Sequence, residues 1–246
     1  MHSNPTQHAL EIGPGLFIQG IRAPLKLARF KLIAFDMDST LIDIECIDEI
    51  ADVVGKGPEV QAITEAAMRG EITNFEDSLR RRLAILAGTP VSALQRVYEH
   101  RLRLNPGALQ LLAYARWDGL KILLISGGFT YFTDRLKPRL GLDFTRSNQL
   151  EIENDRLTGR VIGPVIDQHA KRDTVAEVCR QIGCAHEQVI AVGDGANDLE
   201  MMGLAGLSVA YRAKPKVREF ANVSIDSGGL DRLLTVTVPS VAYRQA

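Results

Sequence analysis

Two aspartates, Asp36 and Asp38, stand two residues apart directly after an apolar run, and Ser39 and Thr40 follow them. In an extended segment the side chains of residues i and i+2 point the same way, so both carboxylates can face one reacting centre. One carboxylate could then attack phosphorus as a nucleophile, while the other donates a proton to the leaving oxygen and later takes one from water. A simple turn is the competing interpretation, because Asp and Ser favour turns through local hydrogen bonds.

A second acidic segment runs from Gly193 to Asp198 in the order Gly-Asp-Gly-Ala-Asn-Asp. The carboxylates of Asp194 and Asp198 and the amide of Asn197 suit a hard cation that takes oxygen ligands, as Mg²⁺ does. The alternative is that Asn197 or Asp198 only caps the helix predicted to follow.

Two further segments could contact a phosphate group. In Ser126-Gly127-Gly128 the glycines would let backbone N–H groups and the Ser126 hydroxyl close on a phosphate. Lys171 would supply a positive charge that offsets the crowded carboxylates. Each has a more ordinary interpretation, because Ser-Gly-Gly is common in plain turns and a single lysine on a helix surface is usually solvated.

Uninterrupted apolar runs bounded by glycine or polar residues predict buried strands of a parallel sheet. Four such runs are present: Lys31 to Asp36, Lys121 to Ser126, Gln188 to Asp194 and Leu207 to Tyr211. Between the second and the third, the alternating segment Phe144 to Ile166 predicts a β-hairpin that turns at Asn154-Asp155. The segment Lys171 to Ile182 has apolar residues at helical spacing and predicts an amphipathic helix.

Strands that alternate with helices predict an α/β fold with a doubly wound parallel sheet, in which ligands bind outside the carboxyl ends of the strands. Asp36, Ser126 and Asp194 are polar residues at the ends of apolar runs, so all three are expected at that edge. Lys171 lies between the last two in the chain and opens a predicted helix. The order Asp-x-Asp, Ser-Gly, Lys, Gly-Asp-Gly-x-Asn-Asp therefore indicates one site more strongly than any segment does alone.

The stretch Ile44 to Leu102 contains no strand-like run, and its helical periodicity is interrupted by glycine and proline. It predicts a small helical domain inserted after the first strand. We therefore expect a core of residues 1–43 and 104–246 and an inserted helical cap of residues 44–103. Near the N-terminus, the apolar stretch Leu16 to Ile21 could be an additional edge strand or simply an arm.

The 246 residues are 46% hydrophobic and 24% charged, which is typical of a globular chain with a sizeable core. A formal net charge of −1 gives no general attraction to nucleic acid or to anionic membranes, so the expected partner is a small molecule. Three cysteines without a CxxC pair indicate neither a disulfide framework nor a zinc site. With no evident signal sequence and no apolar segment near the ~20 residues of a membrane span, we expect a cytoplasmic protein. The sequence does not specify an oligomeric state.

The chain resembles the haloacid dehalogenase superfamily of phosphatases, whose four motifs are matched by Asp36 to Thr40, Ser126, Lys171 and Asp194 to Asp198. It is most similar to the phosphoserine phosphatase branch, over roughly Leu32 to Val217. The matching stretches include DMDSTLIDIECIDEIA, ITEAAMRGE, FEDSLRRRLAIL, SGGFTYF, LTGRVIGPVID, GDGANDLEMM and AGLSVAYRAKP. Those in the inserted domain point to this branch rather than to the superfamily at large.

This resemblance implies roles for individual residues of the core. Asp36 would be the nucleophile and Asp38 the general acid and base. The cofactor would be Mg²⁺, held by the carboxylates of Asp36 and Asp194 and the backbone carbonyl of Asp38, with Asp198 acting through water or hydrogen bonds. The groups that contact the phosphate or the substrate would be Ser126, Gly127, Lys171 and Asn197.

The resemblance also implies that the cap recognises the rest of the substrate. Glu45 would bind an ammonium group and Arg82 a carboxylate, for which a planar guanidinium is well matched. Met68 and Phe75 would close the apolar side of the pocket. Other interpretations stay open: Arg82 could belong to a solvated helix face with its two arginine neighbours, Glu45 could pair with a helix N-terminus, and the two apolar residues could be ordinary cap core.

The implied function is Mg²⁺-dependent hydrolysis of O-phosphoserine to serine, the last step of serine biosynthesis, through an aspartyl-phosphate intermediate. One alternative is a related phosphatase or phosphotransferase that acts on another small phosphate, such as phosphohomoserine. Another is a phospho-accepting module like a response-regulator receiver, which also combines an acidic cluster, Mg²⁺ and a lysine. The helical insertion and the second aspartate, Asp38, argue against a receiver.

Overall fold

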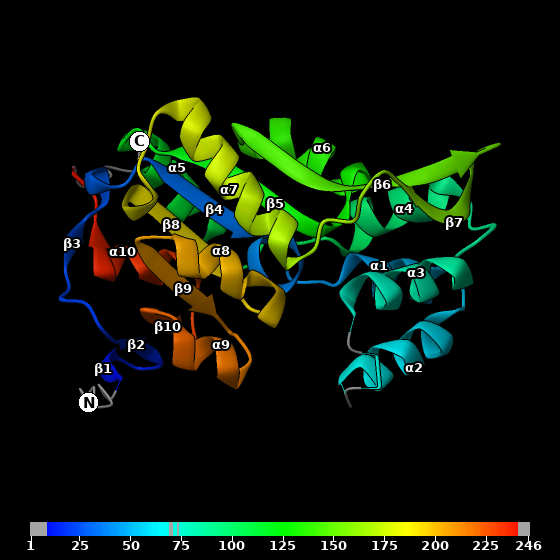
Figure 1. Cartoon of the computed structure of the whole chain (residues 1–246), viewed down its shortest axis with the longest axis horizontal. Coiled ribbons are helices and arrows are strands. Elements are labelled where there is room, and N and C mark those ends of the chain that lie inside the picture. The colour runs from blue at the N-terminus through cyan, green and yellow to red at the C-terminus, as the bar shows by residue number, and fades with distance from the viewer. Residues whose placement is uncertain (1–8, 69–70, 73, 241–246) are drawn as a thin grey trace.

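The computed structural model describes residues 9–68, 71–72 and 74–240 (Figure 1). Its strands are β1 (Leu10–Gly13), β2 (Leu16–Ile18), β3 (Leu25–Lys26), β4 (Leu32–Asp36), β5 (Lys121–Phe129), β6 (Phe144–Glu153), β7 (Arg156–Ile162), β8 (Val189–Gly193), β9 (Leu207–Tyr211), β10 (Val223–Ile225) and β11 (Thr237–Val238). Its α-helices are α1 (Cys46–Val53), α2 (Gly57–Met68), α3 (Phe75–Ile85), α4 (Val91–Arg96), α5 (Ala108–Trp117), α6 (Thr130–Leu140), α7 (Gln168–Ile182), α8 (Leu199–Leu204), α9 (Pro215–Phe220) and α10 (Leu233–Val236). Short helical turns lie at Leu27–Arg29, Met37–Leu41, Val97–Arg101, His186–Gln188, Ala196–Asp198 and Leu230–Arg232.

Nine strands form one sheet in the order β1-β2-β10-β9-β8-β4-β5-β6-β7. From β10 to β6 all neighbours are parallel, whereas β2 and β7 run antiparallel to the strands that they flank. β4 lies between β8 and β5, near the middle of the sheet (Figure 1). The three strands that lead into the acidic and glycine-rich segments are therefore adjacent, and their carboxyl ends meet at one edge.

Successive residues of β4 face opposite sides of the sheet. Ile33 and Phe35 belong to an apolar cluster with side chains from α5, α6 and α10, while Leu32 and Ala34 join a second cluster with α7, α8 and α9. Because both faces of the strand are covered by helices, every one of its residues is buried, and an uninterrupted apolar run is the pattern that such a strand needs. This arrangement confirms the predicted doubly wound α/β fold.

The four predicted strands form β4, β5, β8 and β9, although β5 continues past Ser126 to Phe129, with an irregular register after Ile125. The predicted hairpin is β6 and β7, which pair antiparallel around Asn154 and Asp155, both at positive φ. The predicted helix is α7, and it begins earlier than the periodicity suggested because of an N-cap. The side chain of Asp167 caps it by accepting a hydrogen bond from the amide of Ala170 at 2.8 Å.

The N-terminal alternative resolves in favour of a strand. β2 pairs antiparallel with β10 on one side and with β1 on the other. It therefore extends the parallel sheet, and β1 rather than β2 forms the edge. The sequence did not predict β10, because three residues are too few for a recognisable apolar run. It also missed the small two-stranded sheet of β3 and β11.

All the regular structure between Cys46 and Arg101 is helical within the described residues, as the broken periodicity predicted. Figure 1 shows α1, α2 and α3 together at one end of the molecule, beyond the carboxyl end of β4. The chain enters and leaves this region side by side, because Ile42 bridges Leu104 and the amide of Asp43 donates to the carbonyl of Arg103 at 3.0 Å. This geometry favours an inserted unit with two adjacent connections.

Two smaller findings concern composition. The three cysteines are free, with Cys46 and Cys179 buried and Cys184 half-buried. Among the described residues, the helices all fall short of the length and apolar character that crossing a membrane would require.

Gly107 and Gly55 offer a matched test of the close packing at the start of α5. Both have a φ of +75°, but an added Cβ at Gly55 meets no heavy atom within 4 Å, whereas one at Gly107 would lie 2.5 Å from the backbone nitrogen of Asp231. We expect Gly55→Ala to lower the free energy of unfolding by about 1 kcal/mol through backbone strain. Overpacking adds to that strain in Gly107→Ala, for which we expect a loss of about 3 kcal/mol. Urea unfolding followed by circular dichroism measures both, and equal losses would contradict the close approach.

Candidate active site

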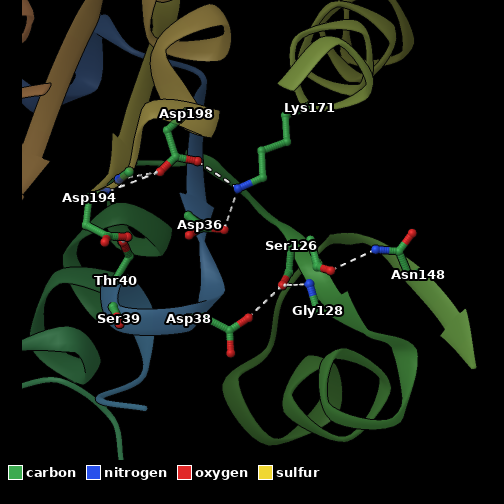
Figure 2. A network of polar contacts seen from close by, with 12 residues as sticks. Asp36, Asp38, Ser39, Thr40, Ser126, Gly128, Asn148, Lys171, Asp194 and Asp198 are labelled. Atoms are coloured by element: carbon green, nitrogen blue, oxygen red, sulfur yellow. Dashed lines mark hydrogen bonds and ion pairs between the residues drawn. The ribbon is translucent and has the colours of Figure 1, made fainter. Parts of the chain in front are cut away.

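The end of β4, the helical turn after β8 and the start of α7 bring three charged groups into direct contact (Figure 2). The ammonium Nζ of Lys171 donates to Oδ1 of Asp36 at 2.6 Å and to Oδ1 of Asp198 at 2.7 Å. Lys171 and Asp198 are 0% exposed and Asp36 is 5% exposed. The interpretation of Lys171 as a solvated surface residue is therefore excluded.

Burial and the neighbouring charges together shift the pKa values of Asp36, Lys171 and Asp194. Burial raises the pKa of Asp36 well above its ordinary value, the carboxylates of Asp198 and Asp194 raise it further, and Lys171 opposes them. Burial alone would lower the pKa of Lys171, but the carboxylates of Asp198 and Asp36 outweigh it, so the pKa is raised. Lys171 is thus a permanent cation at neutral pH. Burial and the charge of Asp198 also raise the pKa of Asp194, to about 6.

Asp198 supports the site rather than capping α8. Its Oδ2 accepts hydrogen bonds from the amides of Asp194 and Gly195, both at 3.1 Å, and it makes no side-chain capping bond to α8. An added Cβ at Gly193 would lie 2.5 Å from the Asp198 carboxyl carbon. Glycine is therefore required at the end of β8 so that this carboxylate can approach the backbone.

Three carboxylates, those of Asp36, Asp194 and Asp198, have oxygen atoms within 4.8 Å of one another. They come from β4 and from the loop after β8, and Thr40 orients one of them by donating to Oδ1 of Asp194 at 3.0 Å. Lys171 is bonded to only two of the three, so the ionised group keeps an excess of negative charge. Oxygen donors with excess negative charge fit a hard divalent cation. This cluster could therefore hold a metal ion.

Asp38 lies in the turn that follows β4, away from this cluster and next to Ser126, Gly127 and Gly128 (Figure 2). These three residues form the irregular end of β5 and are called the glycine loop below. Its Oδ1 accepts from the amide of Cys46 at 2.8 Å, and its Oδ2 accepts from the hydroxyl of Ser126 at 3.0 Å. Burial raises the pKa of Asp38, while these hydrogen bonds lower it. The segment is also a turn, as the competing interpretation held, with Ser39 at a φ of +55°. The turn separates the two carboxylates so that Asp36 meets Lys171 and Asp38 meets Ser126.

The glycine loop is packed tightly against its surroundings. The amide of Gly128 donates to Oγ of Ser126 at 2.7 Å, and Ser126 is fully buried. An added Cβ at Gly127 would lie 2.8 Å from Cζ of Phe75, so the ring of α3 covers this glycine. The helical region and the core therefore meet at the loop that was expected to bind phosphate.

A cavity of about 810 Å³ opens over these groups. Its wall includes Asp36, Asp38 and Gly127 from the core and Glu45, Phe75 and Arg82 from the helical region, together with Asp194 and Asn197. Ser126, Lys171 and Asp198 are buried behind this wall and reach it through their bonds to Asp38 and Asp36. The structure thus gathers the predicted core residues around one space.

Glu45 occupies the N-cap position of α1, as the alternative interpretation held, but its side chain makes no capping bond. Its Oε1 instead accepts from the hydroxyl of Ser39 at 2.6 Å. Burial and the nearby charge of Asp38 raise the pKa of Glu45 to about 7. A carboxylate in this position would gain from a cation placed beside it.

Arg82 differs from the two arginines that precede it. Arg80 and Arg81 are exposed and form ion pairs with Glu76 and Asp77. Arg82 is half-buried on the cavity wall, where its Nε donates to the carbonyl of Ser78 at 3.3 Å. Burial lowers the pKa of Arg82, and the nearby carboxylates oppose this decrease.

Met68 ends α2, but its side chain lies outside the described residues.

Several residues that hold the site were not predicted. Asn105 is buried and donates to the carbonyls of Thr40 and Ile42 at 2.8 and 2.9 Å, which fixes the turn after β4. Asn148 donates to the carbonyl of Gly127 at 2.7 Å. In the sequence, Asn105 stands directly before Pro106 and Gly107, where helical periodicity is interrupted, and Asn148 belongs to the predicted hairpin. An isolated asparagine carries no pattern in one sequence, so no signal there would have found them.

Residues 33–203, more than half of the chain, match the family described as haloacid dehalogenase-like hydrolase. The matched range contains the whole acidic site, from Asp36 to Asp198. A protein of Albidiferax ferrireducens named phosphoserine phosphatase is 59% identical over 236 residues, which cover 94% of this chain and 100% of that protein.

Solved structures agree with this result. One, described as a phospho-aspartyl intermediate analogue of phosphoserine phosphatase, has a TM-score of 0.79 and 38% identity, and the match covers 85% of this chain and 99% of that chain. A substrate-bound phosphoserine phosphatase complex has a TM-score of 0.79 and 37% identity, covering 85% of this chain and 98% of that chain. This chain therefore belongs to the haloacid dehalogenase-like hydrolase family, among the members that are named phosphoserine phosphatase.

Proposed function

We propose that this protein is a Mg²⁺-dependent phosphoserine phosphatase, which hydrolyses O-phosphoserine to serine through an aspartyl-phosphate intermediate, an acyl phosphate on Asp36. The observation that carries the proposal is one cavity that is lined both by Asp36 and Asp38 of the core and by Glu45 and Arg82 of the helical region. The core pair supplies groups for phosphoryl transfer, and the helical pair matches the ammonium and carboxylate of an amino acid. The names of the related proteins support the same substrate.

In the first half of the reaction, a carboxylate oxygen of Asp36 attacks phosphorus and the bond from phosphorus to the serine oxygen breaks. Asp38 donates its proton to that departing oxygen, which leaves as the hydroxyl of serine. Burial raises the pKa of Asp38 and thereby favours the protonated form that this step needs.

In the second half, Asp38 takes a proton from water, and the resulting hydroxide attacks phosphorus of the acyl phosphate. The bond to Asp36 breaks, inorganic phosphate is released and both aspartates return to their starting forms. The hydrogen bond from Ser126 holds Asp38 on the side of the glycine loop. From there Asp38 would first protonate the leaving oxygen and then deprotonate the water.

Charge neutralisation allows an anionic carboxylate to approach an anionic phosphate. Lys171 supplies a fixed positive charge beside Asp36, and Gly127 and Asn197, which line the cavity, would contact the phosphate oxygens or the substrate. Ser126 is buried behind the cavity wall and would act through its hydrogen bond to Asp38. Asp36, Asp194 and the backbone carbonyl of Asp38 would hold Mg²⁺, with Asp198 supporting them through its hydrogen bonds. When bound, the ion would neutralise negative charge on the phosphate.

Residues 44–103 would act as a cap that selects the substrate and excludes bulk water. Phe75 already covers Gly127, and Met68 would join it in closing the apolar side of the pocket. A related enzyme whose substrate lacks amino and carboxylate groups would share the core chemistry but not the need for both Glu45 and Arg82. The tests below therefore address the core chemistry, the metal and the cap in turn.

The first test addresses the nucleophile. We expect Asp36→Asn to abolish turnover, because the amide has nearly the same size but cannot attack phosphorus. Asp38→Asn should also stop turnover of phosphoserine, but it should still accept phosphate from a substrate with a good leaving group. Rapid-quench labelling with a phosphate ester measures this step. A labelled phosphoenzyme in the Asp36→Asn variant would contradict the assignment.

The second test addresses the metal. Mg²⁺ should activate the enzyme, while Ca²⁺ should bind and support little turnover, because its longer bonds and higher coordination number disturb the attack geometry. Phosphate release from phosphoserine, measured after chelation and after re-addition of each ion, distinguishes the two. Full activity after exhaustive chelation would rule out the metal requirement.

The third test addresses the cap. If Arg82 grips the substrate carboxylate in a closed pocket, Arg82→Ala leaves that charge unpaired and should cost about 2–5 kcal/mol. This corresponds to a loss of roughly 30-fold to several thousand-fold in kcat/KM for phosphoserine. An aryl phosphate without amino or carboxylate groups should lose much less.

Arg81→Ala is the matched control, because Arg81 is the exposed neighbour in an ion pair on the same helix. It should change kcat/KM for either substrate by less than about threefold, since an exposed ion pair contributes little. If Arg82→Ala caused equal losses for phosphoserine and the aryl phosphate, Arg82 would support folding or contact the phosphate group rather than the substrate carboxylate. No loss for either would leave phosphoserine unsupported as the substrate.

A further inference from the structure

Asn148 is a buried polar residue next to the site that none of the proposed steps uses. It lies on β6, opposite Phe129 of β5, just beyond the irregular stretch that contains the glycine loop. The residue is 2% exposed, and its side chain points toward that loop (Figure 2). A buried amide needs partners, and those of Asn148 belong to two different segments that are proposed to bind phosphate.

The first partner is the peptide group between Gly127 and Gly128. Nδ2 of Asn148 donates to the carbonyl oxygen of Gly127 at 2.7 Å, and the amide of Gly128 in the same peptide donates to Oγ of Ser126 at 2.7 Å. This peptide is thus held at both its carbonyl and its amide end. Glycine allows many backbone orientations, so two glycines in succession need such external restraints to keep one orientation.

The second partner is the backbone amide of Ile166, which lies just before the helix that carries Lys171. Oδ1 of Asn148 accepts from the amide of Ile166 at 2.9 Å. Ile166 immediately precedes Asp167, which caps α7 and whose carbonyl accepts from the amide of Lys171 at 2.9 Å. One side chain therefore fixes the glycine loop and the start of the lysine-bearing helix relative to each other.

Only a carboxamide satisfies both partners. The Gly127 carbonyl needs a donor and the Ile166 amide needs an acceptor, and asparagine supplies one of each on a short, rigid fork. Aspartate would place an acceptor against the Gly127 carbonyl. Alanine would leave both backbone groups without their bonds in a buried environment.

We propose that Asn148 is a positioning residue for phosphoryl transfer, which holds the Gly127–Gly128 peptide and the N-terminal end of α7 in the arrangement that binds the phosphate group. It acts through these backbone groups and does not touch the substrate. The inference rests on the proposed phosphatase function, because it concerns the phosphate half of the site. It makes no use of the cap residues that would select phosphoserine.

The test compares Asn148→Ala and Asn148→Asp with matched changes at Asn222. The Asn222 side chain also bridges two backbone groups, since Oδ1 accepts from the amide of Ser208 at 3.1 Å and Nδ2 donates to the carbonyl of Gln19 at 3.4 Å. Asn222 lies at the amino ends of β9 and β10, whereas the site lies at the carboxyl ends of the parallel strands. Loss of a structural bridge should therefore lower stability at both positions, but only a loss at Asn148 should change phosphate binding and turnover.

We expect both Asn148 variants to lose about 100-fold in kcat/KM, since a displacement of about 1 Å in a positioning group can cost that much. The loss should be the same for phosphoserine and for para-nitrophenyl phosphate, because both carry the same phosphate group. Inorganic phosphate should bind about tenfold more weakly, as expected for loss of roughly one hydrogen bond to a charged group. Asn222→Ala and Asn222→Asp should lower Tm but stay within about threefold of wild type in kcat/KM and phosphate affinity, because they lie far from the chemistry.

Asn148→Asp keeps the size of the side chain and its bond to Ile166, so it provides the test if Asn148→Ala does not fold. Activity and phosphate affinity of a folded Asn148 variant that match those of the Asn222 variants would overturn the inference. A loss confined to phosphoserine would also overturn it, because it would place the effect in the cap. If the wild type hydrolyses neither ester, the proposed function fails, and calorimetric binding of inorganic phosphate still decides the role of Asn148.

Discussion

The site is built around an electrostatic conflict: several carboxylates are held close together at the ends of β4 and β8, largely out of water. Asp36 and Asp198 are buried and share the ammonium of Lys171, while Asp194 lies within reach of both. Burial and mutual repulsion raise the pKa values of Asp36 and Asp194, so the fold holds these groups against their electrostatic preference. A structure retains such a conflict when the rest of the fold determines where each group must lie. The excess negative charge is also what a bound cation would relieve.

The rest of the fold meets this demand with backbone hydrogen bonds and close packing. Each loop at the site is held by side chains from elsewhere in the chain: Asn105 holds the turn after β4, and Asn148 holds the glycine loop. The amides of Asp194 and Gly195 hold Asp198. Where a side chain must press against the backbone, as Asp198 does at Gly193 and Phe75 at Gly127, only glycine leaves enough room. The motif glycines are therefore explained by specific neighbours rather than by general flexibility.

The helical region adds a second set of constraints to the same cavity. Ser39 joins the two parts, because it lies in the turn that carries Asp38 and donates to Glu45 at the start of α1. The amide of Cys46, also at the start of α1, donates to Asp38 itself. The position of α1 is therefore coupled to the position of Asp38 by two hydrogen bonds. In the proposed reaction this coupling would link substrate recognition by the cap to the proton-transfer group of the core.

The sequence alone was sufficient for the parallel strands, the fold class and the four segments of the site, because a strand covered on both faces needs a continuous apolar run and its carboxyl end is a known place for ligands. It was not sufficient for properties that depend on distant contacts. Nothing in the local pattern distinguishes Arg82 from Arg81, and only packing of α3 against the core turns the first toward the cavity. The burial of Lys171 depends on Asp36, 135 residues earlier in the chain. Asn148 and Asn105 carry no periodic signal, since their function is to satisfy backbone groups that come together only when the chain has folded. Local patterns therefore determined which residues could do the chemistry, and tertiary contacts decided how those residues are held.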